Sequence, residues 1–325
     1  MFAPQDKFIT DYWILKEGAE YHLFHLQAPR ALVDPDKRHA NHSIGHAVSQ
    51  DLKNWTPLPD ALRPDRSLPH ESISLATGSV IKHGATYFML YVGCCGEQGH
   101  SICLATSQDL IKWHKYPGNP VLDKDPRYYD VKGCWADPFI VKNPDGEGFY
   151  IFFKAHASSQ PKGYRGAIGA AFSKDFIKWD VLPPVFSPGL LLEPEVPAVY
   201  HLDGKYYLIM MTIPPVVTDL YAQKIYPATP QWGDIYVVSD NLLGPYGPAE
   251  GIQLTKTKDE MMMVRLIKNP EGGLSALSWW QGYEYYWKDW IKEHEMKSPA
   301  CILNDPRSVR LEFSAKLGFN KIVIQ

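Results

Sequence analysis

The sequence has no excess of charge of either sign and no long apolar run. Its 325 residues carry 33 Lys and Arg against 36 Asp and Glu, a net charge near −3. Proteins that bind nucleic acid or anionic membranes usually carry a basic surface, which this balance does not supply. No run of about 18 apolar residues occurs, as a membrane-spanning helix would need. We therefore expect neither nucleic acid nor a membrane as a partner.

Cysteine is also scarce, and the chain start lacks the features of a secretory signal. The five cysteines are an odd number and do not have the spacing of a disulfide framework, which favours a reducing compartment. The first residues, MFAPQDKFITDYW, show neither a basic segment nor an apolar one, so they do not resemble a signal peptide. These observations predict a cytoplasmic location.

Motifs for metal, phosphate and serine chemistry are missing too. The 12 histidines form no metal-binding pair on a predicted helix, and no Cys-x-x-Cys occurs. The chain has no glycine-rich phosphate loop and no G-x-S-x-G motif. We therefore expect no metal and no cofactor.

A repeated segment is the most informative feature that the chain does contain. GHAVSQDLKNW at 45–55 recurs as LATSQDLIKW at 104–113, as AAFSKDFIKW at 170–179 and, in weaker form, as YVVSDNLLGPY at 236–246. In each copy an apolar run ends at a Ser, an Asp or Asn follows two residues later, and an aromatic residue comes next. Ser and Asp favour turns by bonding to nearby backbone N–H groups. Each copy therefore predicts a strand, a tight turn and a second strand.

A second repeat keeps the same period. Two apolar runs separated by a polar or Gly-bearing turn occur at 11–26, 77–92, 137–153, 195–211 and 263–280. A hairpin followed by a strand–turn–strand unit gives four strands, and four-stranded units repeated around a ring define a β-propeller. No stretch shows a sustained helical period. We predict an all-β, five-bladed propeller over residues 1–325. A β-sandwich with coincidental similarity is the less favoured alternative.

The heads of the predicted first strands carry acidic residues in register. Counting back from the aromatic residue of each hairpin reaches Asp11, Thr77, Asp137 and Glu195, and in the fifth unit the region of 263–265. Equivalent strand heads meet at one end of the central channel, so three carboxyl groups should share one funnel. Like charges at close range raise the pKa of at least one of them. Two carboxyl groups with different pKa values suit acid–base cleavage of a glycosidic bond.

One of these positions has a competitor. Glu193 lies two residues before Glu195 and would share its face in an extended strand; we prefer Glu195, because its register fits and Pro194 interrupts the strand. Other residues near the funnel are candidates for binding the substrate. They include the polar loop 27–43 and the ends of the second strands, and the ones we select are Trp13, Gln27, His42, Thr77, Trp135 and His156.

The segments YHLFHLQAP (21–29) and SIGHAVSQDLKNWTPLPDALRPD (43–65) closely resemble the first blade of glycoside hydrolase family 32, the β-fructofuranosidases. The wider superfamily of five-bladed propeller glycosidases, which includes families 43 and 68, is similar across nearly the whole chain. The resemblance implies a catalytic trio of Asp11, Asp137 (in WADPF) and Glu195 (in LEPEVP). The sequence departs from the family in having Thr-Asp-Tyr-Trp around Asp11, Ala136 where an Arg is usual, and Val196 where a Cys is usual. Compared with family 32 in this way, the chain is expected to be a divergent member without the C-terminal β-sandwich that is common in that family.

The trio predicts an exo-acting glycosidase for a small furanoside. Glu195 would be the general acid, Asp11 the nucleophile of a retaining enzyme or the base of an inverting one, and Asp137 the stabiliser of an oxocarbenium-like transition state. The blade-one resemblance favours retention. The alternatives are a family 43-like inverting arabinofuranosidase or xylosidase, a transferase with the same trio, and a propeller that binds glycans without chemistry. The predicted partner is a small carbohydrate.

Overall fold

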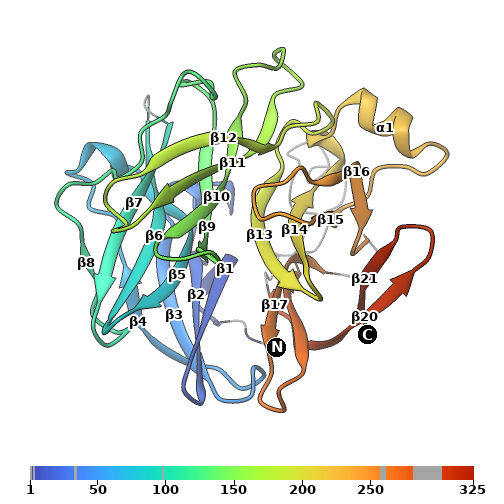
Figure 1. Cartoon of the computed structure of the whole chain (residues 1–325). Coiled ribbons are helices and arrows are strands. Elements are labelled where there is room, and N and C mark those ends of the chain that lie inside the picture. Colours follow the sequence, from blue (N-terminus) through green and yellow to red (C-terminus); the bar gives the residue numbers. More distant parts are fainter. Residues whose placement is uncertain (1, 3, 33–34, 97–98, 257–260, 281–301) are drawn as a thin grey trace.

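The protein is a ring of five β-sheets. The computed structural model describes residues 2, 4–32, 35–96, 99–256, 261–280 and 302–325. In each sheet the first strand lies nearest the centre and its neighbours follow outward in antiparallel order. The first strands β1, β5, β9, β13 and β17 contact one another in that order. The predicted all-β, five-bladed propeller is confirmed (Figure 1).

The blades follow the chain in order. The first three blades consist of β1 (Lys7–Glu17), β2 (Glu20–Pro29), β3 (Ser43–Ser49) and β4 (Thr56–Leu62); β5 (Ser74–His83), β6 (Thr86–Cys95), β7 (Gly99–Ser107) and β8 (His114–Lys115); and β9 (Trp135–Lys142), β10 (Phe149–His156), β11 (Gly166–Ser173) and β12 (Asp180–Phe186).

The last two blades differ from one another in their construction. They consist of β13 (Glu195–Leu202), β14 (Lys205–Thr212), β15 (Gly233–Ser239) and β16 (Gly247–Gln253); and β17 (Met262–Lys268), β18 (Leu274–Trp280), β20 (Arg307–Ser314) and β21 (Phe319–Ile324), with β19 (Ile302–Leu303) paired to β18. The segment 307–324 thus supplies the two outer strands of the fifth blade.

The helical elements in the described residues are few and lie in connections between strands. They are the 3-10 helices η1 (Pro35–Ala40), η2 (Pro69–Glu71) and η3 (Pro214–Val216) and the helix α1 (Asp219–Ile225). The Thr218 hydroxyl caps α1 by accepting the N–H of Tyr221, which satisfies one of the free donors at a helix start. Within the described residues, no helix is long and apolar enough to cross a membrane.

The repeated turn forms as the sequence predicts. In the first copy the Ser49 hydroxyl accepts the N–H groups of Asp51 and Leu52, and the Asp51 carboxylate accepts those of Lys53 and Asn54. The indole N–H of Trp55 donates to the carbonyl of Leu52. The same bonds to the Asp and from the Trp recur in the second and third copies. The side chains of the motif therefore satisfy the backbone of the turn.

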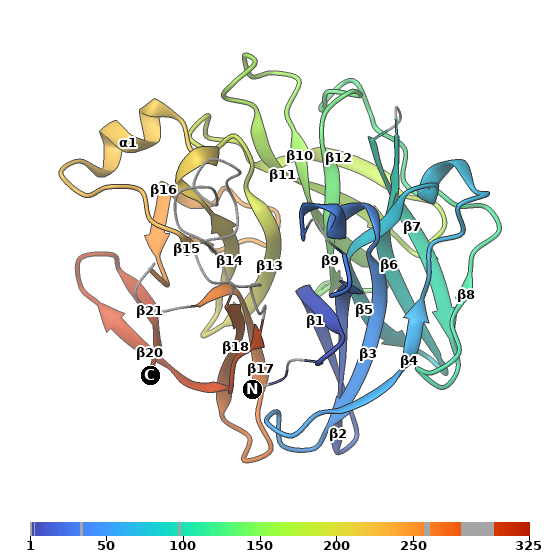
Figure 2. The ribbon, with the colours of Figure 1, turned by 180° about the vertical axis from the view of Figure 1, so that it is seen from behind.

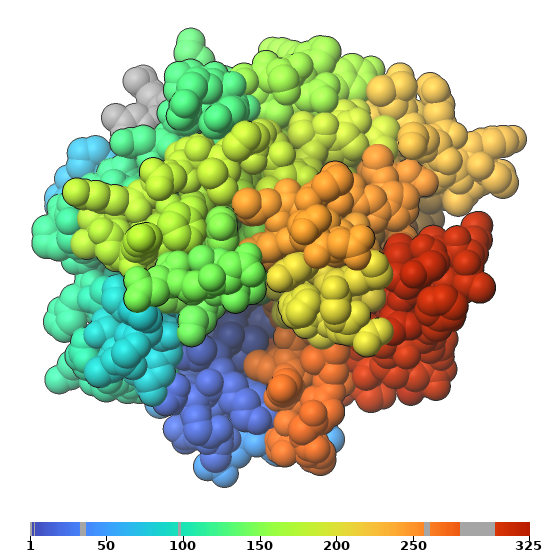
Figure 3. All heavy atoms as spheres, viewed as in Figure 1, coloured from blue at the N-terminus to red at the C-terminus, as the bar shows by residue number. Residues whose placement is uncertain are grey.

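Contacts between the first and fifth blades close the ring. The Tyr12 hydroxyl donates to the carbonyl of Met263 at 3.1 Å, and the Tyr21 hydroxyl donates to that of Lys268 at 2.9 Å. Phe2 forms a β-bridge with Leu303. Apolar side chains from both blades pack into one buried cluster at this junction. Figure 3 shows the first blade, in blue, against the orange hairpin of the fifth.

Each first strand contains a β-bulge near its inner end. The register shifts between Ile9 and Tyr12, and equivalent shifts interrupt β5, β9, β13 and β17. Positive φ angles accompany three of these bulges, at Asp137 (56°), Val196 (46°) and Met263 (53°). A bulge bends the strand and changes the direction of the side chains around it. The bulges therefore decide which side chains of the strand heads reach the central channel.

Candidate active site

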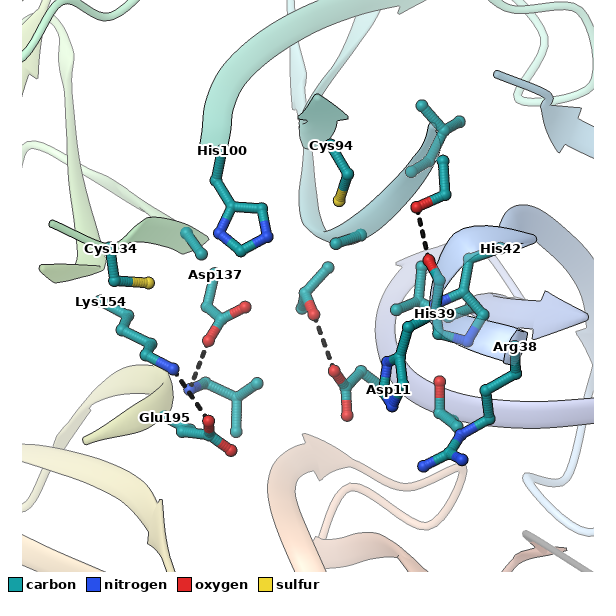
Figure 4. Close-up of a pocket in the computed structure, with 18 of the residues that line it drawn as sticks. Asp11, Arg38, His39, His42, Cys94, His100, Cys134, Asp137, Lys154 and Glu195 are labelled. Atoms are coloured by element: carbon teal, nitrogen blue, oxygen red, sulfur yellow. Dashed lines mark hydrogen bonds and ion pairs between the residues drawn. The ribbon is translucent and has the colours of Figure 1, made fainter. Parts of the chain in front are cut away.

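A cavity of about 410 Å³ opens at the strand heads, and the three predicted carboxyl groups line it. Asp11 comes from β1, Asp137 from β9 and Glu195 from the first residue of β13. All three side chains are half-buried. Figure 4 shows them facing the same space from three blades. The strand-head register thus brings together residues that are 126 and 58 positions apart in the sequence.

Asp11 is the most strongly perturbed of these groups. Burial raises the pKa of its carboxyl group to about 7, and the nearby charges of Asp137 and Glu195 act in the same direction. The Thr77 hydroxyl opposes the shift by donating a hydrogen bond to Asp11 Oδ2 at 2.9 Å. The predicted crowding of like charges is thus visible at Asp11, whose proton is lost near neutral pH.

Asp137 and Glu195 are held by different partners. Asp137 Oδ2 accepts the backbone N–H of Val196 at 3.1 Å, which ties the head of β9 to that of β13. Glu195 Oε1 accepts a hydrogen bond from Lys154 Nζ at 2.8 Å. Burial disfavours the Lys154 ammonium, but Glu195, Glu193 and other neighbours outweigh it and hold the pKa of Lys154 well above its usual value. Lys154 is therefore a permanent cation beside Glu195.

Glu193 lies behind Lys154 and does not line the cavity. Its Oε2 lies 2.8 Å from Lys154 Nζ, and its Oε1 lies 2.8 Å from His156 Nε2. Burial acts to raise the pKa of Glu193, but these two partners outweigh it and lower the pKa to about 2. A carboxyl group that stays ionised cannot donate a proton at neutral pH. This arrangement favours Glu195 over Glu193 as the general acid.

The loop between β2 and β3, a blue segment in Figure 2, supplies another part of the cavity wall. Figure 4 shows its labelled residues across from Lys154 and Glu195. Arg38, His39 and His42 line the cavity, and the rings of His39 and His42 meet edge to face at 5.4 Å. Burial lowers the pKa of His42 well below its usual value. The His42 imidazole is therefore neutral at pH 7.

The six predicted substrate-binding residues take different positions. Thr77 and His42 line the cavity. His156 does not: it bonds Glu193 and accepts the N–H of Cys134 on Nδ1. Gln27 is also outside the lining, because its amide donates to Asp60 Oδ1 at 2.7 Å.

The two tryptophans lie in the core instead of the cavity. Trp135 is 1% exposed and packs against Tyr129 and Phe153. Trp13 is 4% exposed and stacks on Phe24. The expectation for Trp135 counted two residues back from Asp137, but the bulge of β9 breaks strict alternation next to Asp137. In the structure neither tryptophan presents a face to a sugar ring.

Sequence reasoning did not select several residues of the lining. Lys154 and Cys94 lie on second strands, whose ends were expected near the funnel, but neither they nor Arg38, His39, His100 and Cys134 were selected as binding residues. The polar loop 27–43 was the available signal for Arg38 and His39. The described part of the chain holds no group of three or more His, Cys, Asp or Glu arranged for a metal ion.

The fold and the cavity define a class of proteins: five-bladed propellers with an acidic central pocket. The chain matches the model of the glycosyl hydrolases family 32 N-terminal domain over residues 2–246, and it belongs to that family.

Curated relatives match parts of the chain. A sucrose:sucrose 1-fructosyltransferase of Festuca arundinacea is 29% identical over 198 residues, 56% of this chain and 27% of that protein. A vacuolar acid β-fructofuranosidase of Rosa hybrid cultivar is 30% identical over 171 residues, 51% of this chain and 24% of that protein. The matched regions cover about a quarter of the length of each of these relatives.

Solved structures share the fold. An inulosucrase from Halalkalicoccus jeotgali bound to kestose superposes with a TM-score of 0.71 at 17% identity, covering 99% of this chain and 89% of that one. A fructan 1-exohydrolase from Cichorium intybus superposes with a TM-score of 0.70 at 19% identity, covering 100% of this chain and 59% of that one. These likenesses show the same propeller along the whole described chain.

Proposed function

We propose that the protein is a glycoside hydrolase that releases a terminal furanoside, of the β-fructofuranoside type, in the central cavity. The observation that carries the proposal is that Asp11, Asp137 and Glu195, from three blades, line one cavity of about 410 Å³. Membership of family 32 and the fructoside-acting relatives support it. A cavity of this size accommodates a small sugar, which fits an exo-acting enzyme.

The three carboxyl groups take separate roles in the proposed mechanism. Glu195 protonates the oxygen of the leaving group. Asp11 attacks the anomeric carbon, which requires its ionised form, so activity rises with pH through the Asp11 pKa of about 7. Asp137 remains fixed to the Val196 N–H and stabilises positive charge on the sugar ring as the bond breaks. Water then displaces Asp11 from the glycosyl intermediate, with Glu195 acting as the base.

The proposal includes retention of anomeric configuration. Retention follows from a covalent intermediate on Asp11, whereas direct attack by water would invert the centre. Proton NMR of the first sugar released, recorded before mutarotation, distinguishes the two. An inverted product would replace this mechanism with the family 43-like alternative, in which Asp11 is the base and the substrate is an arabinofuranoside or xyloside.

Transfer to a sugar acceptor is the second candidate function. Relatives of this chain include a sucrose:sucrose 1-fructosyltransferase and a 6(G)-fructosyltransferase. The same intermediate on Asp11 can react with a sugar hydroxyl in place of water. Chromatography of products at increasing sucrose concentration separates the functions, because a transferase forms trisaccharides and a hydrolase releases free monosaccharides.

The first prediction tests the chemistry itself. Asp11→Asn should reduce hydrolysis of furanosides by at least about 10³-fold, since the nucleophile is lost, without lowering the thermal midpoint. Asp180→Asn, which changes an exposed carboxyl group on the outer strand β12, is the matched control and should retain full activity. Wild-type protein that binds sugars without turning over any furanoside would contradict the proposal and favour the non-catalytic, glycan-binding propeller.

Two broader expectations accompany this function. We propose that residues 1–325 act as one catalytic domain and that the protein is cytoplasmic. Some relatives are vacuolar by name, so localisation of a tagged protein is the measurement that decides the second point.

A further inference from the structure

A buried arginine lies at the junction of the third, fourth and fifth blades, outside the cavity lining. Arg265 on β17 is 5% exposed, and its guanidinium lies over the ring of Phe139 at 5.8 Å. Its Nη1 donates to the carbonyl oxygen of Val196 at 3.1 Å and to that of Val264 at 3.4 Å. Burying an arginine is costly unless the charge is satisfied, so its location calls for a reason.

Arg265 bonds the carbonyl oxygen of Val196, the residue that follows Glu195. Val196 has a φ of 46°, a conformation that costs about 1–3 kcal/mol for a β-branched residue and persists only where its surroundings enforce it. Two contacts enforce it here. Asp137 accepts the Val196 N–H from the third blade, and Arg265 donates to the Val196 carbonyl from the fifth. The backbone after Glu195 is thus held on both sides.

The charge of Arg265 also acts on several ionisable groups near it. Its charge lowers the pKa of Asp11 on β1 against the effect of burial, and it acts in the same direction on Asp234 of β15. Tyr12 and Tyr200 are the other titratable groups that its charge affects. One cation therefore serves two buried carboxyl groups, of which Asp11 belongs to the cavity.

We propose that Arg265 is a positioning residue for the reaction: by clamping the Val196 peptide it aims Glu195 and Asp137 at the sugar. Its charge, which lowers the pKa of Asp11, supports this role. The inference rests on the proposed function. It assigns a role in catalysis to the fifth blade, whose described residues (261–280 and 302–325) contribute none to the cavity lining. Arg265 acts through the backbone and through charge, without touching the substrate.

Two substitutions separate the clamp from the charge. Arg265→Met removes both, so we expect kcat to fall by roughly 100-fold, as misplacement of a reacting group by about 1 Å can produce. We also expect the acid limb of the kcat/KM profile to move up by about half a pH unit or more. Arg265→Lys keeps the positive charge but replaces the guanidinium group that bonds the Val196 carbonyl. We therefore expect kcat to fall while the acid limb of the kcat/KM profile stays in place. Arg310→Met, in an exposed residue of β20, is the control.

A purely structural arginine gives a different result. In that case both Arg265 variants lower the thermal midpoint while kcat and the acid limb stay at their wild-type values, and the inference is overturned. Arg265→Lys keeps the test decisive if Arg265→Met does not fold. KM should change much less than kcat, because the clamp aims the catalytic groups and makes no contact with bound sugar.

A measurement without substrate separates this inference from the proposed function. Asp11→Asn removes a buried charge, so it should raise the thermal midpoint at pH 8. The gain should be larger in the Arg265→Met background, where the Asp11 charge has lost its neighbouring cation. Equal gains in both backgrounds would show that Arg265 does not act on Asp11. Absence of furanoside turnover by the wild-type protein would instead overturn the proposed function.

Discussion

Lys154 lies between the two glutamates that compete for the role of general acid. Its Nζ contacts Glu193 and Glu195 at 2.8 Å each, and only Glu195 lines the cavity. His156 occupies the other oxygen of Glu193. The result is an ordered row of alternating charge that ends at the cavity. The row explains how two glutamates so close in sequence can differ in environment, since Glu193 is held between Lys154 and His156 and Glu195 lines the cavity.

Substitution of each glutamate tests this division. Glu195→Gln should lower turnover of sucrose by about 10²–10⁴-fold, the contribution of a general acid. On a nitrophenyl furanoside, whose leaving group needs no proton, the first release of nitrophenol should stay fast and appear as a burst, whereas the steady rate falls because Glu195 is also the base of the second step. Glu193→Gln should lower kcat on both substrates by a similar, smaller factor, because it disturbs the position of Lys154. Burst and steady-state kinetics on the two substrates provide the comparison, and leaving-group dependence in Glu193→Gln alone would reverse the assignment.

The residues that sequence could identify here are those whose place depends on strand register. Asp11, Thr77, Asp137 and Glu195, which precede the aromatic residue of their hairpins by 10 to 12 residues, all line the cavity. Gln27 and His156 were chosen by the same logic but are engaged by Asp60 and Glu193. Such pairings join distant strands, so they depend on side-chain contacts that no local pattern encodes.

At the scale of the element, the environment of side chains next to the bulges of the first strands could not be predicted from the alternation of residues. Alternation correctly gives two faces along most of β9, yet Trp135 and Asp137 differ in environment although they are two residues apart. The positive φ of Asp137 is one that Asp tolerates better than most residues. A bulge depends on the partner strand, so the sequence of β9 alone does not predict it.

The repeated turn, by contrast, is a local element that the sequence predicts well. Its Ser accepts two backbone N–H groups in the third copy, from Asp175 and Phe176. In the fourth copy, the Ser239 hydroxyl accepts the N–H of Asn241. The copy at 236–246 that matches the repeated segment least thus forms a turn with fewer bonds to its Ser hydroxyl.

The two copies form a matched pair for a stability test. Ser173→Ala leaves two N–H groups without their acceptor and should lower the free energy of unfolding by about 2 kcal/mol. Ser239→Ala removes one such bond and should cost about 1 kcal/mol. Chemical denaturation monitored by tryptophan fluorescence gives both values. Equal losses, or a larger loss for Ser239→Ala, would show that the hydroxyl bonds do not determine the stability of these turns.

At the scale of the whole molecule, the number of blades was readable from the repeats but the manner of closure was not. The fifth hairpin has no clear turn copy after it, and its outer strands come from 307–324 instead. The bonds from Tyr12 and Tyr21 to the fifth blade span 251 and 247 residues. Contacts of such sequence separation follow from the ring and are invisible in any local segment. The sequence also carries an aromatic segment at 279–290, whose alternating side chains predict packing between blades. Trp279 packs in a buried cluster, and residues 281–290 lie outside the described residues.

The pH dependence of global stability reflects buried groups that act in opposite directions. Asp11 and Asp234 have folded pKa values raised to about 7, so their contribution is present at low pH and is lost as pH rises through 7. Burial lowers the pKa of His25 to about 4 and that of His46 to about 3. Their contribution is present above the unfolded value of about 6.5 and is lost as the pH falls.

His46 offers the cleanest test of this balance. Its ring stacks on Phe24 at 4.4 Å and meets His22 at 3.1 Å, while His25 and His22 add to the cost of charging it. His22 is in turn affected by Glu20 and Glu17, and His25 by Asp60. Between pH 7 and pH 5, protonation of the unfolded His46 but not the folded one should cost about 2 kcal/mol of folding free energy. His46→Gln, which stays neutral, should lose about that much less stability over this range than the wild type.

Urea unfolding at both pH values measures the effect, with His114→Gln, a change in an exposed histidine, as the control that should behave as the wild type does. The comparison uses the change between the two pH values, so a loss of packing that is common to both cancels. If wild type and His46→Gln lose the same stability on acidification, His46 is not the group that takes up the proton on unfolding. The acid sensitivity of the ring would then have to arise from His25 or His42, the other two buried imidazoles with strongly lowered pKa values.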